Sequence, residues 1–237
     1  LARKVFAHTA RYDSMIASYL EEKEKERKGE GGAPDCLRTE FRKLHDLRYG
    51  ENPHQKGAVY VRRGAREAGA VTARKLSGKE MSFNNYLDAA AALEIVKDFD
   101  EPAVSVMKHT NPCGAAAGPD LVEAFKAAYA GDPLSAFGSI IGLNGRVDPK
   151  VAAEIARPER FVEAVIAPAF EDEAVEILTT KPKWGKSVRL LAAGDLASRD
   201  RKEYDLRSVT GGLVRQERDL GFPEFDKLEV ATERAPS

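Results

Sequence analysis

The chain has 237 residues, 43% hydrophobic and 32% charged, a composition typical of a globular protein of one or two domains. Its 37 basic and 38 acidic side chains give a net charge of −1, which argues against nucleic acid or an anionic membrane as partner. No apolar run approaches the roughly 20 residues of a membrane span, and the first residues lack the apolar core of a signal peptide. The two cysteines, Cys36 and Cys113, are far apart in sequence, so we expect no disulfide scaffold and a cytoplasmic location.

The first twenty residues predict an amphipathic helix, because their apolar side chains recur at helical spacing. The segment 21–35 is a charge run that ends in Gly-Gly and Pro, which predicts a frayed helix end followed by a linker. The chain opens at Leu1 inside the predicted helix and ends as abruptly, so we expect it to be a piece of a longer protein.

From about residue 40 onwards, short apolar runs alternate with helical patterns. The runs predict strands at 57–62, 103–107, 139–143, 163–168 and 187–193. The helical patterns between them lie at 84–99, 119–131, 149–156 and 171–178. This alternation predicts an α/β domain, a sheet covered by helices.

The stretch LRYGENPHQ, residues 47–55, is almost entirely polar. Arg48 offers a planar set of donors that suits phosphate or carboxylate, and Tyr49 offers a flat ring with a polar tip. Gly50 and the Asn52-Pro53 pair would turn the chain sharply. The pattern fits a ligand-binding loop and, equally, a polar connector before the next strand.

A second polar stretch, MKHTNPCGAAAG at 107–118, begins where a buried strand ends. Lys108 is a charged donor and His109 can exchange a proton near neutral pH, and ligands of α/β sheets gather beyond the carboxyl ends of strands. An immediate turn would let both side chains face one site, and the helix that starts near Pro119 could receive an anion at its free N–H groups. The alternative is a charged strand cap without chemistry.

The same stretch argues against zinc. A zinc deaminase carries His-x-Glu and then Pro-Cys-x-x-Cys, whereas here Pro112-Cys113 is followed by Ala116 in place of the second cysteine, and no His-x-Glu occurs. The four histidines are scattered without ligand spacing, so we expect no metal. We expect Cys113 to be a small buried residue rather than a nucleophile.

A third stretch, DPLSAFGS at 132–139, brings a turn and Gly138 to the start of a strand, where backbone could approach a ligand. Taken alone, it fits a plain helix-to-strand connector better. Neither a Rossmann glycine motif nor a P-loop is present in the sequence, so nucleotide cofactors of those kinds have no support.

Four motifs together carry a family resemblance: LRYGENPHQ, FNNYLDAAAAL, KHTNPCG and DPLSAFGSIIGLNGRVD. In this order they resemble the AICAR transformylase domain of the bifunctional AICAR transformylase/IMP cyclohydrolase family, over roughly residues 40 to 215. The first twenty residues look like the tail of the preceding cyclohydrolase domain. The resemblance thus divides the chain into that tail (1–20), a charged linker (21–38) and the N-terminal half of the transformylase domain (39–237).

The resemblance implies a cytidine-deaminase-like α/β fold, a mixed sheet flanked by helices without the deaminase zinc site. It implies transfer of a formyl group from 10-formyltetrahydrofolate, the co-substrate, to the 5-amino group of AICAR in purine biosynthesis. It further implies a homodimer, no metal, and no nucleic-acid or membrane partner. Because the second half of the transformylase has no counterpart here, the alternative is a ribonucleotide-binding or assembly module without catalysis.

The resemblance also assigns residues. It places the catalytic pair at Lys108 and His109, the histidine as general base and the lysine stabilising the charge that develops. The AICAR contacts that it implies are Arg48, Tyr49, Asn85, His109, Gly138 and Glu163.

Overall fold

The computed structural model describes residues 1–197, 204–220 and 233. The chain divides into two compact units. Leu1–Lys43 and Tyr60–Gly64 form the N-terminal unit, and Leu44–Val59 with Ala65–Ser237 form the sheet unit. Among the described residues, no helix is both long enough and apolar enough to span a membrane.

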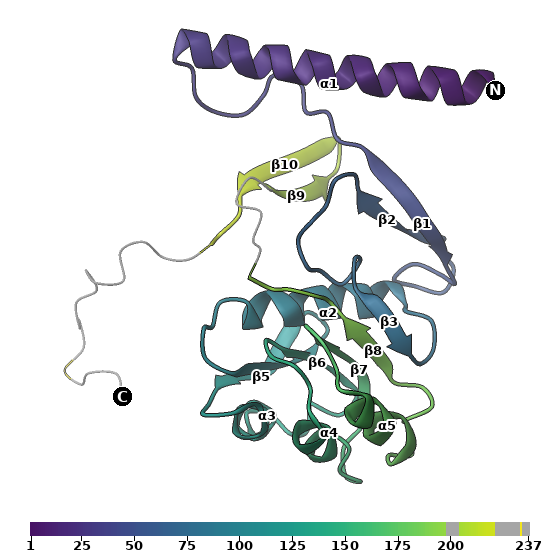
Figure 1. The fold of residues 1–237 in the computed structure, drawn as a ribbon, viewed down its shortest axis with the longest axis vertical. Coiled ribbons are helices and arrows are strands. Elements are labelled where there is room, and N and C mark those ends of the chain that lie inside the picture. The colour runs from purple at the N-terminus through teal and green to yellow at the C-terminus, as the bar shows by residue number, and fades with distance from the viewer. Residues whose placement is uncertain (198–203, 221–232, 234–237) are drawn as a thin grey trace. The chain divides into compact units, whose positions relative to one another are not determined.

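A long helix, α1 (Ala2–Lys28), dominates the N-terminal unit (Figure 1). It confirms the helix predicted for the first twenty residues but runs further, so the predicted linker at 21–38 is helical in its first part. Glu, Lys and Arg are good helix formers and pair along the helix, as Glu24 and Lys28 do at 2.8 Å. The helix ends at Gly29, whose positive φ of 68° turns the chain away.

The sheet unit is built on one mixed six-stranded sheet. Its strands, in the order in which they lie side by side, are β3 (Arg74–Ser77), β8 (Arg189–Ala192), β7 (Val162–Ala167), β6 (Ser139–Leu143), β4 (Ala103–Lys108) and β5 (Asn111–Ala117). The central β6, β7 and β8 run parallel, whereas β3, β4 and β5 pair antiparallel with their neighbours. This architecture confirms the predicted α/β class and the mixed sheet.

In the described part of the chain, helices cover both faces of the sheet (Figure 1). α2 (Phe83–Val96) packs on one face, over a core that includes Met107 and Ile140. The other face buries a second core under α3 (Leu121–Ala130), α4 (Pro149–Ile155) and α5 (Asp172–Thr180). All four helices lie where the sequence predicted them, with ends shifted by up to three residues.

Helix α2 is fixed closely against the sheet. Ser105 in β4 donates a hydrogen bond from Oγ to the carbonyl oxygen of Ala92, at 2.7 Å. Gly142 in β6 lies at the same place, where a Cβ atom would come within 2.5 Å of that oxygen. The N-terminus of α2 is closed by a reciprocal cap between Ser82 and Asn85. The cap at its start and the close contact at Ala92 therefore give α2 a defined position relative to β4.

Two further two-stranded ribbons complete the description. β1 (Phe41–Leu47) pairs with β2 (Gly57–Arg62), and β9 (Tyr204–Val209) pairs with β10 (Gly212–Glu217). The strand predicted at 57–62 is confirmed as β2. The sequence analysis missed β1, β3, β5, β9 and β10. These strands are mostly exposed, so they lack the apolar run or clear alternation that announces a buried strand.

Candidate active site

An open cavity of about 600 Å³ lies in the sheet unit, at the end of β4. Of the seven residues that the family resemblance assigns to the site, six line it: Tyr49, Asn85, Lys108, His109, Gly138 and Glu163. The seventh, Arg48, lines a second cavity of about 420 Å³. The two cavities share Tyr49, Ser82 and Arg189, so they adjoin. The structure thus brings together residues that are more than a hundred positions apart in sequence.

The tip of the β4–β5 hairpin carries Lys108 and His109 into the cavity. Lys108 pairs with Asn111, which leaves His109 and Thr110 as a two-residue turn. Both have positive φ, 55° and 57°, the pattern of a type I′ turn that usually takes Asn and Gly. A side chain in this conformation costs about 1–2 kcal/mol, and Thr is also β-branched. Strain of this kind concentrates at functional sites.

Lys108 is held by the backbone rather than by a counter-ion. Its Nζ donates to the carbonyl oxygen of Phe137 at 2.7 Å, which leaves two N–H donors for a ligand. In the described part of the chain, no carboxylate forms an ion pair with it. The exposed imidazole of His109 has no hydrogen-bond partner among the same residues. The turn therefore offers a cation and a proton acceptor side by side.

The loop at 132–138 supports this lysine. Asp132 accepts a hydrogen bond from the Ser135 amide at 3.0 Å, and hydrogen bonds from Ser135 hold the pKa of Asp132 below its ordinary value. Gly138 has a φ of 81° and donates its N–H to the Phe161 carbonyl at 2.8 Å. This loop fixes the carbonyl that receives Lys108, so it is more than the plain connector that the stretch alone suggested.

Glu163 faces the cavity already paired. Its carboxylate lies 2.6 Å from the guanidinium of Arg189, whose other nitrogens donate to the Glu80 carbonyl at 3.0 and 3.1 Å. The sequence analysis missed Arg189. The only signal was one arginine in the mostly apolar run SVRLLAA. Because Arg189 lines both cavities and fixes Glu163, it links the two halves of the site.

The remaining candidates are Asn85 and Tyr49, which line this cavity, and Arg48, which lines the adjoining one. Asn85 accepts the Ser82 amide at 3.1 Å with its side-chain oxygen, so its NH₂ group stays available to a ligand. The guanidinium of Arg48 stacks on the ring of Tyr49, 4.8 Å from its centroid, and donates to the Tyr49 hydroxyl at 3.2 Å. These groups provide hydrogen-bond donors and a flat aromatic surface, a combination suited to a polar ring with anionic substituents.

Comparison with known proteins decides the family. The model of the AICARFT/IMPCHase bienzyme family matches residues 1–237, the whole chain. The chain belongs to this family. It is 49% identical to the bifunctional purine biosynthesis protein PurH of Rhodopirellula baltica over 222 residues, which covers 92% of the chain and 41% of that protein. It is 45% identical to PurH of Acetivibrio thermocellus, over 100% of the chain and 44% of that protein. The chain therefore spans about two fifths of the length of these relatives.

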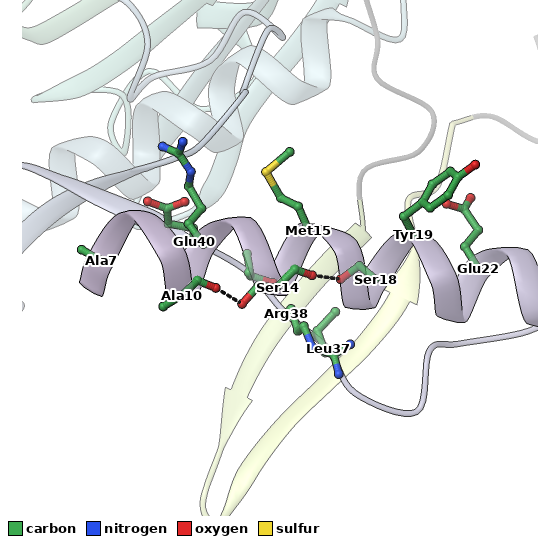
Figure 2. Close-up of a pocket in the computed structure, with 12 residues that line it drawn as sticks. Ala7, Ala10, Ser14, Met15, Ser18, Tyr19, Glu22, Leu37, Arg38 and Glu40 are labelled. Carbon is green, nitrogen blue, oxygen red and sulfur yellow. Dashed lines mark hydrogen bonds between the residues drawn. The ribbon is translucent and has the colours of Figure 1, made fainter. Parts of the chain in front are cut away.

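The chain also has a larger hollow, of about 820 Å³, within its N-terminal unit (Figure 2). It lies between α1 and residues 37–40 and is lined by side chains such as Met15, Tyr19 and Leu37. One of the two arginines that line it is paired within this unit. Arg38 pairs with Glu21 at 3.0 Å, and its hydrogen bond lowers the pKa of Glu21. Without a cluster of reactive groups, this hollow is not a candidate active site.

One expectation for this family member is wrong. The helix α3 does not offer an anion site beside Lys108, because β5 first carries the chain back along β4, as far as the pair Ala103 and Ala117. The N-terminus of α3 therefore lies at the far end of β4. Its amides are also occupied, since Asp120 accepts hydrogen bonds from the first turn at 2.9 Å.

Metal and thiol chemistry gain no support in the described residues of this family member. No group of three or more His, Cys, Asp or Glu side chains among them could hold a metal ion. Burial raises the pKa of the Cys113 thiol, and the nearby Asp132 adds to the rise. A raised pKa disfavours the thiolate, so Cys113 is poorly suited to act as a nucleophile.

Proposed function

We propose that this chain carries the catalytic pair of an AICAR transformylase, which transfers a formyl group from 10-formyltetrahydrofolate to the 5-amino group of AICAR. The observation that carries the proposal is the strained β4–β5 turn. It presents Lys108 and His109 to a cavity that also contains Tyr49, Asn85 and Glu163. The family match to a bifunctional purine-biosynthesis enzyme supports the same chemistry.

The reaction needs a base and a group that stabilises negative charge. The amine of AICAR is a weak nucleophile, because its lone pair is conjugated with the ring and the carboxamide. As its nitrogen attacks the formyl carbon, His109 accepts the proton that the nitrogen loses. The tetrahedral intermediate carries an oxyanion, which the ammonium of Lys108 stabilises. Lys108 also assists protonation of the folate nitrogen, whose bond to the formyl carbon then breaks to give formyl-AICAR and tetrahydrofolate.

The groups around Lys108 and His109 bind AICAR in the ground state. Arg48 and Tyr49 bind the ribonucleotide through charge-assisted hydrogen bonds and ring packing, as a loop of that composition can. Asn85, Gly138 and Glu163 complete the AICAR contacts that the resemblance implies. No metal takes part in this proposal.

The proposal concerns the parent protein, because the chain covers 41% and 44% of its PurH relatives. We infer that residues 1–20 are the tail of a cyclohydrolase domain, 21–38 the junction, and 39–237 the first half of a cytidine-deaminase-like transformylase that acts as a homodimer. The second candidate is a ribonucleotide-binding module without catalysis, which the partial coverage of the relatives, 41% and 44%, favours for the 237-residue chain tested alone.

The proposal is tested with Lys108→Gln and His109→Asn in the full-length protein. We expect each to lower formyl transfer by about 10²- to 10⁴-fold, the range for a general base or an oxyanion donor. Lys150→Gln and His8→Asn, at exposed positions outside the cavity, are the matched controls and should keep full turnover. Near-normal turnover in both site variants would overturn the assignment. AICAR binding by the 237-residue chain without turnover would favour the module for this chain.

A further inference from the structure

We propose that Asp88 is a positioning residue for the β4–β5 turn, an inference that rests on the proposed function of Lys108 and His109. Its carboxylate oxygen Oδ1 accepts a hydrogen bond from the backbone N–H of Thr110 at 2.7 Å. Neither the motif pattern nor the resemblance singled this residue out. The hydrogen bond joins residues that are 22 positions apart and lie on different elements, α2 and the hairpin tip.

The β4–β5 turn needs a support from outside because its two residues are strained at positive φ. Type I′ turns favour Asn and Gly, whose side chains tolerate positive φ, whereas here His109 and Thr110 occupy both positions. Local hydrogen bonds already engage the His109 carbonyl, which accepts from Thr110 Oγ1 at 2.7 Å and from Asn111 Nδ2 at 2.8 Å. The amide of Thr110 points instead to α2, where Asp88 receives it.

Asp88 is well placed for this task, because the helix that carries it is fixed. The reciprocal cap of Ser82 and Asn85 closes the N-terminus of α2, and Ser105 and Gly142 hold its middle against the sheet. A charged acceptor on a fixed helix therefore selects one conformation of the turn. Since Lys108 and His109 adjoin Thr110, that conformation also decides where their side chains point.

A direct contact of Asp88 with substrate is the competing interpretation, because the residue also lines the cavity. The two interpretations differ in what restores activity. If Asp88 acts through the backbone, a residue that adopts positive φ without strain should replace its support. Thr110→Gly supplies such a residue. If Asp88 touches substrate, no change at Thr110 restores the contact.

The experiment uses the full-length enzyme with four variants: Asp88→Asn, Asp88→Ala, Thr110→Gly and the double variant Asp88→Ala/Thr110→Gly. We expect Asp88→Ala to lower kcat about 10- to 100-fold with little change in the AICAR KM, since small misplacement of reacting groups has effects of that size. Asp88→Asn keeps an acceptor oxygen in the same place and should retain most activity. The double variant should recover about tenfold over Asp88→Ala. Asp100→Ala, at an exposed aspartate outside the cavity, is the control.

Amide hydrogen exchange gives a readout that does not depend on catalysis. We expect faster exchange in residues 106–112 of Asp88→Ala, and wild-type exchange in Asp88→Asn. This result would stand even if the enzyme proved to catalyse another reaction, so failure of the proposed function is distinguishable. Unchanged exchange in Asp88→Ala, a raised AICAR KM with unchanged kcat, or no recovery in the double variant would each overturn the inference. If Asp88→Ala does not fold, Asp88→Leu, which is close to aspartate in size, favours the helix and has no acceptor, takes its place in the same comparison.

Discussion

The sheet unit contains two hairpins with turns of equal length and different chemistry. Lys108 pairs with Asn111 across the β4–β5 turn, and Val209 pairs with Gly212 across the β9–β10 turn, so each turn has two residues. In β9–β10 the positive φ, 86°, belongs to Gly211, which adopts it without steric cost. In β4–β5 it belongs to His109 and Thr110. The β9–β10 hairpin, which does not line the candidate cavity, uses the favourable residue, and the β4–β5 hairpin at the cavity uses residues with reactive or hydrogen-bonding side chains.

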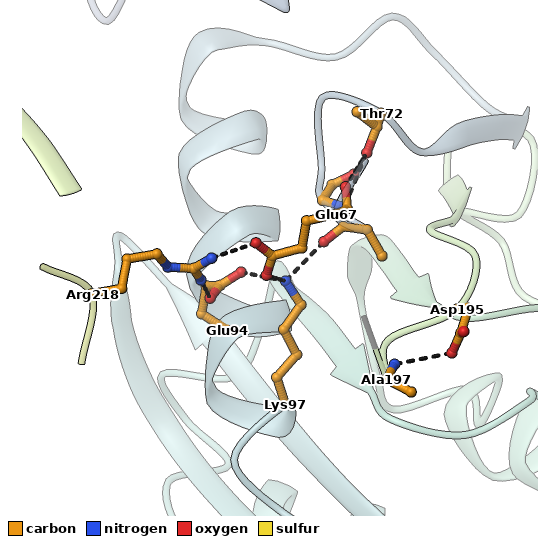
Figure 3. A network of polar contacts seen from close by, with 9 residues as sticks. Glu67, Thr72, Glu94, Lys97, Asp195, Ala197 and Arg218 are labelled. Atoms are coloured by element: carbon orange, nitrogen blue, oxygen red, sulfur yellow. Dashed lines mark hydrogen bonds and ion pairs between the residues drawn. The ribbon is translucent and has the colours of Figure 1, made fainter. Parts of the chain in front are cut away.

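The two hairpins also differ in what holds them. The β4–β5 turn is supported at its tip by Asp88 and, through Lys108, by the Phe137 carbonyl. The β9–β10 hairpin is followed by Arg218, which contacts Glu67 and Glu94 beside the buried side chain of Lys97 (Figure 3). Contacts at the tip of the β4–β5 hairpin define the direction of its turn side chains. The contacts of Arg218, which lie beyond the β9–β10 hairpin, attach that hairpin without fixing its turn. The comparison predicts opposite responses to mutation in the two turns.

The largest change in formyl transfer should come from replacing His109 and Thr110 with the residues that a type I′ turn prefers. His109→Asn/Thr110→Gly installs the Asn-Gly pair that type I′ turns prefer, so we expect stability to rise by about 1–2 kcal/mol. Formyl transfer should fall by about 10²- to 10⁴-fold, since the base is lost. Urea unfolding and steady-state rates of the full-length protein test both halves. A stabilised variant with full activity would contradict the catalytic role of His109.

A second comparison uses the arginine–tyrosine stacks of the two regions. Arg48 stacks on Tyr49 at 4.8 Å beside the cavity, and Arg215 stacks on Tyr204 at 3.3 Å in the β9–β10 hairpin. Arg48→Ala should raise the AICAR KM about 10- to 100-fold, the value of a charged hydrogen bond, with little change in the folate KM. Arg215→Ala is the matched control and should change neither.

Tyr49→Phe separates the contribution of the Tyr49 hydroxyl from that of its ring and of Arg48. This variant keeps the ring and removes only the hydroxyl that accepts from Arg48, so its effect on the AICAR KM should be smaller than that of Arg48→Ala. An unchanged AICAR KM with a raised folate KM in Arg48→Ala would assign the loop to the other substrate.

The third prediction concerns Gly211 itself. A Cβ atom at this position would have no neighbour within 4 Å, so Gly211→Ala adds strain at positive φ and no clash. We expect a loss of about 1 kcal/mol in stability without a change in formyl transfer. Thr110→Gly should have the opposite sign, a gain of similar size. If Gly211→Ala and Thr110→Gly change the stability in the same direction, the two turns do not differ in the way proposed.

Strands rich in β-branched or aromatic residues could be predicted from the sequence almost to the residue. SIIGL predicted β6 and GAVYVR predicted β2 with their observed bounds. β5, NPCGAAA, was missed because it has no β-branched or aromatic residue and contains Pro112 and Gly114, which an edge strand tolerates. This one missed strand also caused the wrong expectation for α3, since it moves the helix start to the other end of β4.

Some residues of the candidate site could also be predicted from the sequence, and others could not. Lys108 and His109 could be found because a polar pair directly follows an apolar run. Asp88, Phe137 and Arg189 could not, because each acts through contacts with distant residues. Those contacts span 22 positions for Asp88, 29 for Phe137, and 26 and 109 for Arg189, and no local pattern encodes them. Sequence reasoning thus identifies reactive groups more readily than the groups that hold them.

The smallest expected effect concerns the attachment beyond the β9–β10 hairpin. Burial alone would raise the pKa of Glu67, but hydrogen bonds from Lys97 and Arg218 outweigh it and hold the pKa below its ordinary 4.5. A lowered pKa stabilises the fold above about pH 4.5, and this contribution is lost as the pH falls through the pKa of the folded state. Arg218→Ala removes one of the two cations, so the pKa of Glu67 should move back up.

We therefore expect Arg218→Ala to cost about 0.5–1 kcal/mol at pH 7, a modest value because the arginine is partly exposed. The difference from wild type should shrink as the pH falls below 4.5, because a protonated Glu67 gains less from either cation. Unfolding free energies from pH 7 to pH 3.5 measure this. Arg207→Ala is the control, since its pair with Asp205 lies on the surface and should contribute little at any pH. A difference that stays constant with pH would mean that Arg218 stabilises the fold by packing rather than through the charge of Glu67.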